Sequence, residues 1–218
     1  DILKEKVRMQ SRALTQKNTR LTGFPTNRLS ETQSIDPAGG TTTETVDVNR
    51  AARTATKTTT RTGIAQPQVE NLVNGLTVSV TDPAGLVTST TYDALLRPQT
   101  VTDSRGNTTT TTYYSGTRLV QTIANAAGNV TAFAYDTLGR PVWQRDAQNR
   151  YTRYSYNTRG QVIRQWGDGT MPVEYGYDAT YGDRITMSTF RGGTGWDGTT
   201  WPTSPGTADT TTWTYNAG

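Results

Sequence analysis

Apolar and polar residues alternate along most of this chain instead of recurring at helical spacing. Counting back in steps of two from successive tyrosines gives sets of residues that an extended chain places on one face. These sets are Thr88, Thr90 and Tyr92; Thr109, Thr111 and Tyr113; Thr131, Phe133 and Tyr135; Thr152, Tyr154 and Tyr156; and Val173, Tyr175 and Tyr177. The pattern predicts short β-strands whose aromatic side chains pack together along one face of a sheet.

Turn residues separate the predicted strands. Asp82-Pro83-Ala84-Gly85 is typical of a type I turn, because aspartate bonds its own backbone, proline presets φ and glycine accepts a left-handed exit. A strand over residues 86–92, a turn over 93–96 and a return strand over 97–102 then complete one hairpin. Asn74-Gly75 predicts a two-residue type I′ hairpin turn.

The hairpin recurs with a fixed period. Tyrosines 92, 113, 135, 156 and 177 are spaced by 21 or 22 residues. We therefore predict an all-β fold of tandem antiparallel β-hairpins, about 21 residues per repeat, forming a wide curved sheet. The expected divisions are irregular or degenerate repeat strands over 1–81, regular repeats over 82–191, a loop insertion over 192–206 and the start of a further repeat over 207–218.

The repeat resembles the Rhs/YD family of tyrosine–aspartate repeats. The run Tyr135-Asp136-Thr137-Leu138-Gly139-Arg140 is similar to the family's Y-D-x-x-G-R core, and Tyr92-Asp93 begins a related run. We expect the motif residues to be structural, with turn carboxylates accepting backbone N–H groups. They are Tyr92, Asp93, Arg97, Tyr113, Arg118, Tyr135, Asp136, Gly139, Arg140, Tyr156, Asn157, Tyr177 and Asp178.

The resemblance implies a segment of a β-shell that encloses or presents a cargo domain, as in Rhs effectors and the B and C components of Tc toxins. It also implies a secreted or cell-surface protein whose partners are flanking repeats of a longer chain and an enclosed C-terminal toxin domain. Teneurin-like relatives imply the alternative of a cell-surface adhesin that binds a glycan or a protein. The family's self-cleaving aspartate segment has no counterpart that can be recognised in these residues.

The composition excludes several kinds of catalytic and metal-binding site. The chain has no histidine and no cysteine, which removes the commonest general base and metal ligand as well as thiol chemistry. The aspartates recur with the turns, and a periodic residue is rarely a unique catalytic group, so we predict neither enzyme activity nor a cofactor or metal. The net charge of +4 is scattered, and we predict neither nucleic-acid binding nor a membrane span.

A glycine-rich segment, Trp196-Asp197-Gly198-Thr199-Thr200-Trp201-Pro202, interrupts the repeat. Trp196 and Trp201 are the candidate ligand residues, since exposed tryptophans can stack on a sugar or hold a partner. The alternative is that both tryptophans pack the loop against the aromatic face of the sheet.

Overall fold

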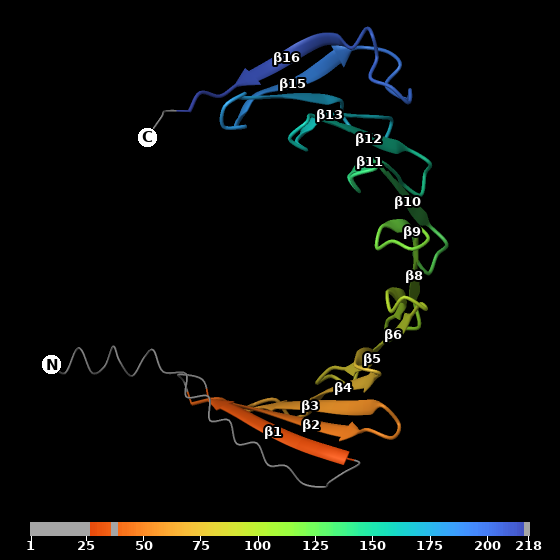
Figure 1. Ribbon diagram of the computed structural model, residues 1–218, viewed down its shortest axis with the longest axis vertical. Helices are drawn as coiled ribbons and strands as arrows, with labels where there is room; N and C mark the ends of the chain where they lie inside the picture. Colours follow the sequence, from red (N-terminus) through yellow and green to blue (C-terminus); the bar gives the residue numbers. More distant parts are fainter. Residues whose placement is uncertain (1–26, 36–38, 216–218) are drawn as a thin grey trace, which may run out of the picture. The chain divides into compact units, whose positions relative to one another are not determined.

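The computed structural model describes residues 27–35 and 39–215, and every regular element in these ranges is a strand (Figure 1). The chain divides into two compact units, Asp1–Thr108 and Thr109–Gly218. Residues 1–26 of the segment expected to be irregular lie outside the described ranges. Across the described ranges, no helix is long and apolar enough to span a membrane.

The first unit contains the strands up to the unit boundary, and within it each strand pairs antiparallel with its sequence neighbours. They are β1 (Asn27–Ile35), β2 (Thr41–Asn49), β3 (Thr54–Arg61), β4 (Gln68–Val73), β5 (Leu76–Thr81), β6 (Val87–Tyr92) and β7 (Pro98–Thr102).

The second unit begins within β8 and has the same antiparallel pairing of sequence neighbours. Its strands are β8 (Thr108–Tyr113), β9 (Val120–Ala124), β10 (Val130–Tyr135), β11 (Pro141–Arg145), β12 (Tyr151–Tyr156), β13 (Val162–Trp166), β14 (Val173–Tyr177), β15 (Arg184–Gly192) and β16 (Gly206–Thr212).

Within each unit strand order follows chain order, so the prediction of tandem antiparallel hairpins is confirmed. The predicted strands over 86–92 and 97–102 match β6 and β7 to within one residue. The five repeat tyrosines end β6, β8, β10, β12 and β14. A register shift comes directly before each of them, which marks the β-bulge where the strand enters its turn.

The turn at Asn74-Gly75 has positive φ at both residues, 52° and 81°, as a type I′ turn requires. It joins β4 to β5 through the pair Val73 and Leu76.

Strand register separates two faces in the second unit. Phe133 lies opposite Gln144 and Gln144 opposite Thr152, so these residues share a face with Tyr154, which follows Thr152 by two. This tyrosine face is the one that the alternating pattern predicted. The opposite face carries Trp143 and Trp166 and is called the tryptophan face below.

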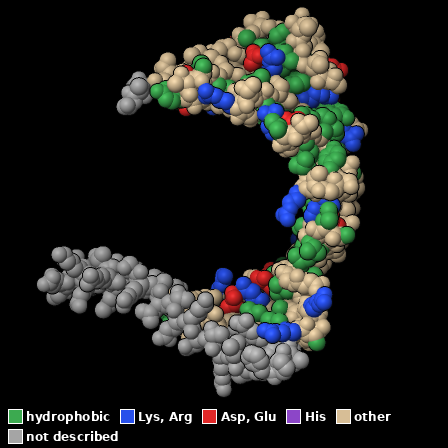
Figure 2. Space-filling view, in the orientation of Figure 1, with side chains coloured by type: hydrophobic (Ala, Val, Ile, Leu, Met, Phe, Trp, Pro, Cys, Tyr) green, Lys and Arg blue, Asp and Glu red, His purple; other side chains and the backbone are tan. Residues whose placement is uncertain are grey.

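Burial is sparse because a single sheet covers little of its own surface. Among the described residues, the hydrophobic side chains under 9% exposed are Ala132 and Trp166, both at 6%. Thr152 and Arg153 are the buried polar residues of the same ranges, at 7% and 8%. In the space-filling view, hydrophobic side chains form small patches between polar atoms (Figure 2). The best-covered part of the second unit therefore lies around β10, β12 and β13.

Candidate functional site

The Tyr-Asp turn is closed by one carboxylate. Asp136 Oδ1 accepts the backbone N–H groups of Leu138, at 2.9 Å, and Arg140, at 3.0 Å. Asp136 Oδ2 accepts both Arg140 Nε and Arg140 Nη2, each at 2.7 Å, so two guanidinium nitrogens converge on one carboxylate oxygen. The backbone N–H of Gly139 donates to the carbonyl of Asp136 at 3.0 Å, and Gly139 takes a φ of 77°. These bonds satisfy the polar groups of a turn that no strand partner reaches.

The other turns use the same geometry. Asp93 accepts the backbone N–H groups of Leu95 and Arg97 and pairs with the Arg97 guanidinium. Asn157 Oδ1 accepts the N–H groups of Arg159 and Gln161, each at 3.0 Å. The turns that connect successive hairpins repeat the arrangement. Their acceptor residues are Asp82, Asp103, Asn125 and Asp146.

The turn hydrogen bonds set the electrostatics of the carboxylates. The backbone N–H of Arg140 and then its side chain hold the pKa of Asp136 below the ordinary value. For Asp93, the side chain of Arg97 is the largest cause of a lowered pKa. Lowered values keep these groups ionised at neutral pH, so they act as fixed acceptors and are poor proton donors.

One motif assignment is wrong. Arg118 was expected to be equivalent to Arg97 and Arg140, five residues after its tyrosine. Tyr113 pairs with Val120, and the Tyr114 N–H donates to the carbonyl of Leu119, so Leu119 holds the position in question. The turn contains one residue more than the turn after Tyr92, and the extra residue moves Arg118 out of register.

Asp178 lies in a turn of the same longer kind. Its N–H donates to the carbonyl of Asp183 at 2.7 Å, and its Oδ1 accepts from Thr180 at 2.9 Å and Tyr181 at 2.6 Å. The acceptor role of the motif residue is therefore retained when the turn lengthens.

Tyrosine hydroxyls connect several hairpins to the hairpin before them, a contact that the alternating pattern did not predict. The hydroxyls of Tyr92, Tyr156 and Tyr177 each donate to a backbone carbonyl 15 residues earlier, at 2.8, 2.7 and 2.8 Å. The acceptors are Thr77, Pro141 and Val162, at or next to the start of the preceding return strand. Each hydroxyl lies 15 residues after the carbonyl that it bonds, because the hairpins repeat with a nearly constant length. The hydroxyl of Tyr215 donates in the same way to the first residue of β15, Arg184, at 2.9 Å.

Tyr177→Phe tests this connection. Removing the hydroxyl leaves the Val162 carbonyl without that donor, so the free energy of unfolding should fall by about 1 kcal/mol. Urea unfolding measures the change. Tyr181→Phe is the matched control, because Tyr181 is 82% exposed and its loss should cost less than about 0.5 kcal/mol. Equal effects at both positions would contradict a specific role for the Tyr177 hydroxyl.

Substitutions at Asp136 test the turn. Asp136→Ala removes every acceptor and is expected to lower the unfolding midpoint by about 3–6 °C. Asp136→Asn retains one acceptor oxygen, as Asn157 already does in its own turn, and should cost less than half as much. Thermal unfolding measures both. If asparagine is as damaging as alanine, the charge pair with Arg140 outweighs the backbone bonds.

The same pair of variants has a pH signature. The lowered pKa of Asp136 means that its contribution is complete above the unfolded value and is lost as pH falls through the folded value. The difference in stability between wild type and Asp136→Ala should therefore shrink below about pH 4. A constant difference down to pH 2 would show that ionisation of Asp136 is not involved.

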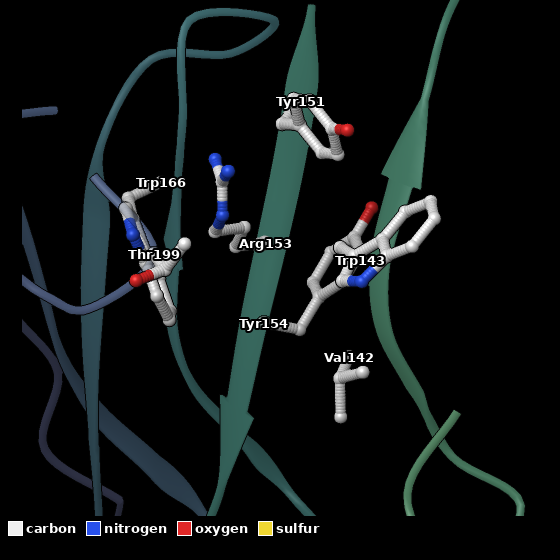
Figure 3. Close-up of a pocket in the computed structure, with 7 residues that line it drawn as sticks. All are labelled: Val142, Trp143, Tyr151, Arg153, Tyr154, Trp166 and Thr199. Atoms are coloured by element: carbon white, nitrogen blue, oxygen red, sulfur yellow. The ribbon is translucent and has the colours of Figure 1, made fainter. Parts of the chain in front are cut away.

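A second group of side chains lies on the tryptophan face. Trp143 of β11 lies opposite Arg153 of β12, and Arg153 lies opposite Trp166 of β13, so the three residues form a row across three strands. The Arg153 guanidinium lies 4.4 Å from the ring centroid of Tyr151, and the Tyr151 ring meets the edge of Trp143 at 5.4 Å. This row surrounds a hollow of about 420 Å³ (Figure 3).

The loop after β15 folds onto the same face. Trp201 packs edge-on against Trp166 at 5.8 Å and against Phe190 at 5.3 Å, and Trp196 meets Trp201 at 5.1 Å. Trp166 Nε1 donates to the carbonyl of Gly198 at 3.2 Å, which fixes the loop backbone. The tryptophans thus pack the loop onto the sheet, but on the tryptophan face and not on the predicted tyrosine face. A ligand role for Trp196 and Trp201 stays a prediction.

The described residues contain no group of three or more carboxylates close enough to hold a metal ion. What the geometry does define is a class of protein: a tandem β-hairpin repeat with turns closed by aspartate or asparagine and hairpins linked by tyrosine hydroxyls. Residues 73–109 match the family model described as RHS Repeat. This part of the chain is therefore similar to the RHS repeat, in agreement with the Tyr-Asp motif.

One solved structure shows a similar fold. The chain matches the structure titled "Crystal Structure of TcdB2-TccC3-TEV" with a TM-score of 0.54 and 14% identity, over 78% of this chain and 10% of that one. A second match, "Crystal Structure of TcdB2-TccC3", has a TM-score of 0.34 and 14% identity, over 88% of this chain and 15% of that one. The chain thus spans about a tenth of the length of the first structure's chain. No match was found among curated proteins.

Proposed function

We propose that this chain is a non-catalytic wall segment of an RHS-type shell, which encloses or presents a cargo domain outside the producing cell. The fold similarity to TcdB2-TccC3-TEV and the RHS repeat support a structural segment of a longer chain. The proposed partners are flanking repeats and a cargo domain with toxin activity.

The observation that carries the proposal is the link between consecutive hairpins. Within each unit strand pairing runs from one hairpin into the next, and at three hairpins a tyrosine hydroxyl adds a bond to a carbonyl 15 residues earlier. Such pairing lets an arbitrary number of units extend one sheet while leaving few unpaired backbone groups. A wall needs this property, whereas an active site needs a unique cluster of side chains.

Limited proteolysis of the full-length protein that contains this chain tests the proposal. We expect the domain beyond the repeats to resist protease in the intact protein and to be cut rapidly when it is expressed alone. A variant that weakens the wall, such as Tyr156→Phe combined with Tyr177→Phe, should shift the intact protein toward rapid cutting. Equal cutting of the domain with and without the repeats would refute enclosure.

A further inference from the structure

The hollow on the tryptophan face contains a positive charge that forms no ion pair with any described residue. Arg153 is 8% exposed, and its Nη1 atom has no hydrogen-bond partner among the described residues. The guanidinium lies over the ring of Tyr151. Arg145, which lies opposite Tyr151 on the same face, also has a buried nitrogen, Nε, that lacks a partner in the described ranges. A buried guanidinium without a counter-charge is costly, and an anion that reached it would remove this cost.

The turn after β13 carries a carboxylate, Asp168. Its Oδ1 accepts the backbone N–H of Tyr151 at 2.5 Å and holds the start of β12, and among the described residues it forms no ion pair with Arg153. The positive charge of Arg153 therefore remains available to a ligand.

The walls of the hollow are aromatic. Figure 3 shows the Arg153 guanidinium between the rings of Trp166 and Tyr151, with Trp143 beyond Tyr151. The faces of these rings carry partial negative charge and attract the polarised C–H groups of a saturated ring. Thr199, from the loop after β15, completes the lining and offers one hydroxyl group, whereas the side chain of Tyr154, which also borders the hollow, belongs to the tyrosine face. The ligand that fits combines one negative charge, a saturated ring whose C–H face meets the aromatic rings, and a hydroxyl group for Thr199.

The size of the hollow agrees with a small molecule. Its volume of about 420 Å³ falls in the range of small-ligand sites, roughly 300–1,000 Å³, and exceeds what a lone acidic side chain would fill. The bond from Trp166 Nε1 to the Gly198 carbonyl holds the loop next to Thr199, so the wall is formed before a ligand arrives.

We propose that this hollow binds a carboxylate-bearing monosaccharide of the uronic acid class, with the carboxylate on the Arg153 guanidinium and the sugar face against the tryptophans. This site is independent of the wall function, since a shell segment needs no ligand. It adds a binding activity on the tryptophan face of the second unit.

Saturation-transfer NMR and calorimetric titration of the full-length protein with free glucuronic acid test the site. The neutral glucuronamide should bind at least about tenfold more weakly, because it loses a charge-assisted hydrogen bond. N-acetylglutamate methylamide, which presents a carboxylate on a peptide, should also bind at least about tenfold more weakly, since it lacks the ring. Equal binding of glucuronic acid and glucuronamide, or of glucuronic acid and the glutamate derivative, would overturn the proposal, as would no binding of glucuronic acid.

Variants locate the site. Arg153→Gln should lower the affinity for glucuronic acid at least about tenfold, and Thr199→Val should lower it several-fold without disturbing the strands. Arg191→Gln is the matched control, because Arg191 is exposed and pairs with Asp209 on β16, and it should bind like wild type. If Arg153→Gln does not fold, the comparison of ligands on the wild-type protein and the affinity of Thr199→Val still test the proposed site. Wild-type affinity in a folded Arg153→Gln variant would place the binding elsewhere.

Discussion

Gly167→Ala is expected to lower the free energy of unfolding of the second unit by about 3–5 kcal/mol. Gly167 follows β13 directly and has a φ of 132°, which is strained for any residue with a Cβ. A Cβ at this position would overlap the carbonyl oxygen of Tyr151 and approach its carbonyl carbon to 2.8 Å.

The Tyr151 carbonyl cannot easily move away. It accepts the backbone N–H of Gly169 at 2.9 Å, while the Tyr151 N–H donates to Asp168 at 2.5 Å. Relief of the overlap would therefore break bonds that hold the first residue of β12. Urea unfolding followed by tryptophan fluorescence measures the loss of stability.

Gly128→Ala is the control. Gly128 also has a positive φ, 79°, but a Cβ there would meet nothing within 4 Å. Its cost should be about 1 kcal/mol, which reflects backbone conformation alone. Similar costs at the two glycines would show that contact with Tyr151 does not limit position 167.

Trp166→Ala is the second substitution with a large expected effect, about 3–5 kcal/mol. Trp166 is 6% exposed and contacts the Trp201 ring and the Gly198 carbonyl. Its removal leaves a cavity and frees the loop over residues 193–205, so protease cutting in that loop should rise together with the loss of stability.

Trp166→Phe separates the two effects. Phenylalanine retains a ring beside Trp201 and removes the Nε1 donor to Gly198, which should cost about 1–2 kcal/mol. Stability and loop cutting are measured on both variants. Unchanged loop cutting in Trp166→Ala would contradict the inference that this residue holds the loop on the sheet.

Much of the fold could be predicted from local patterns. Period-two alternation placed Tyr92 and its equivalents at strand ends, and turn chemistry at Asp136 and Asn157 could be inferred because an Asx side chain bonds to backbone groups only two to four residues away. Interactions of such short range depend little on the rest of the molecule.

Register was harder to predict where the repeat length varied. The single additional residue in the turn after Tyr113 moved Arg118 away from the expected position, which Leu119 occupies. Spacing counted from the tyrosine alone cannot show on which side of a turn an extra residue lies, because the strand pairing decides it.

The site on the tryptophan face could not be read from the sequence. Trp143, Arg153 and Trp166 lie on three different strands and are at least ten residues apart in the chain. Their alignment depends on the register of those three strands. Alternation revealed that two faces exist but not which one a loop would cover. By itself the sequence determined the hairpin repeat and its turns, because these depend on contacts within one unit. Only the tertiary structure decided which face the loop covers and that a nitrogen of the buried Arg153 has no hydrogen-bond partner in the described ranges, because both depend on residues brought together from separate strands.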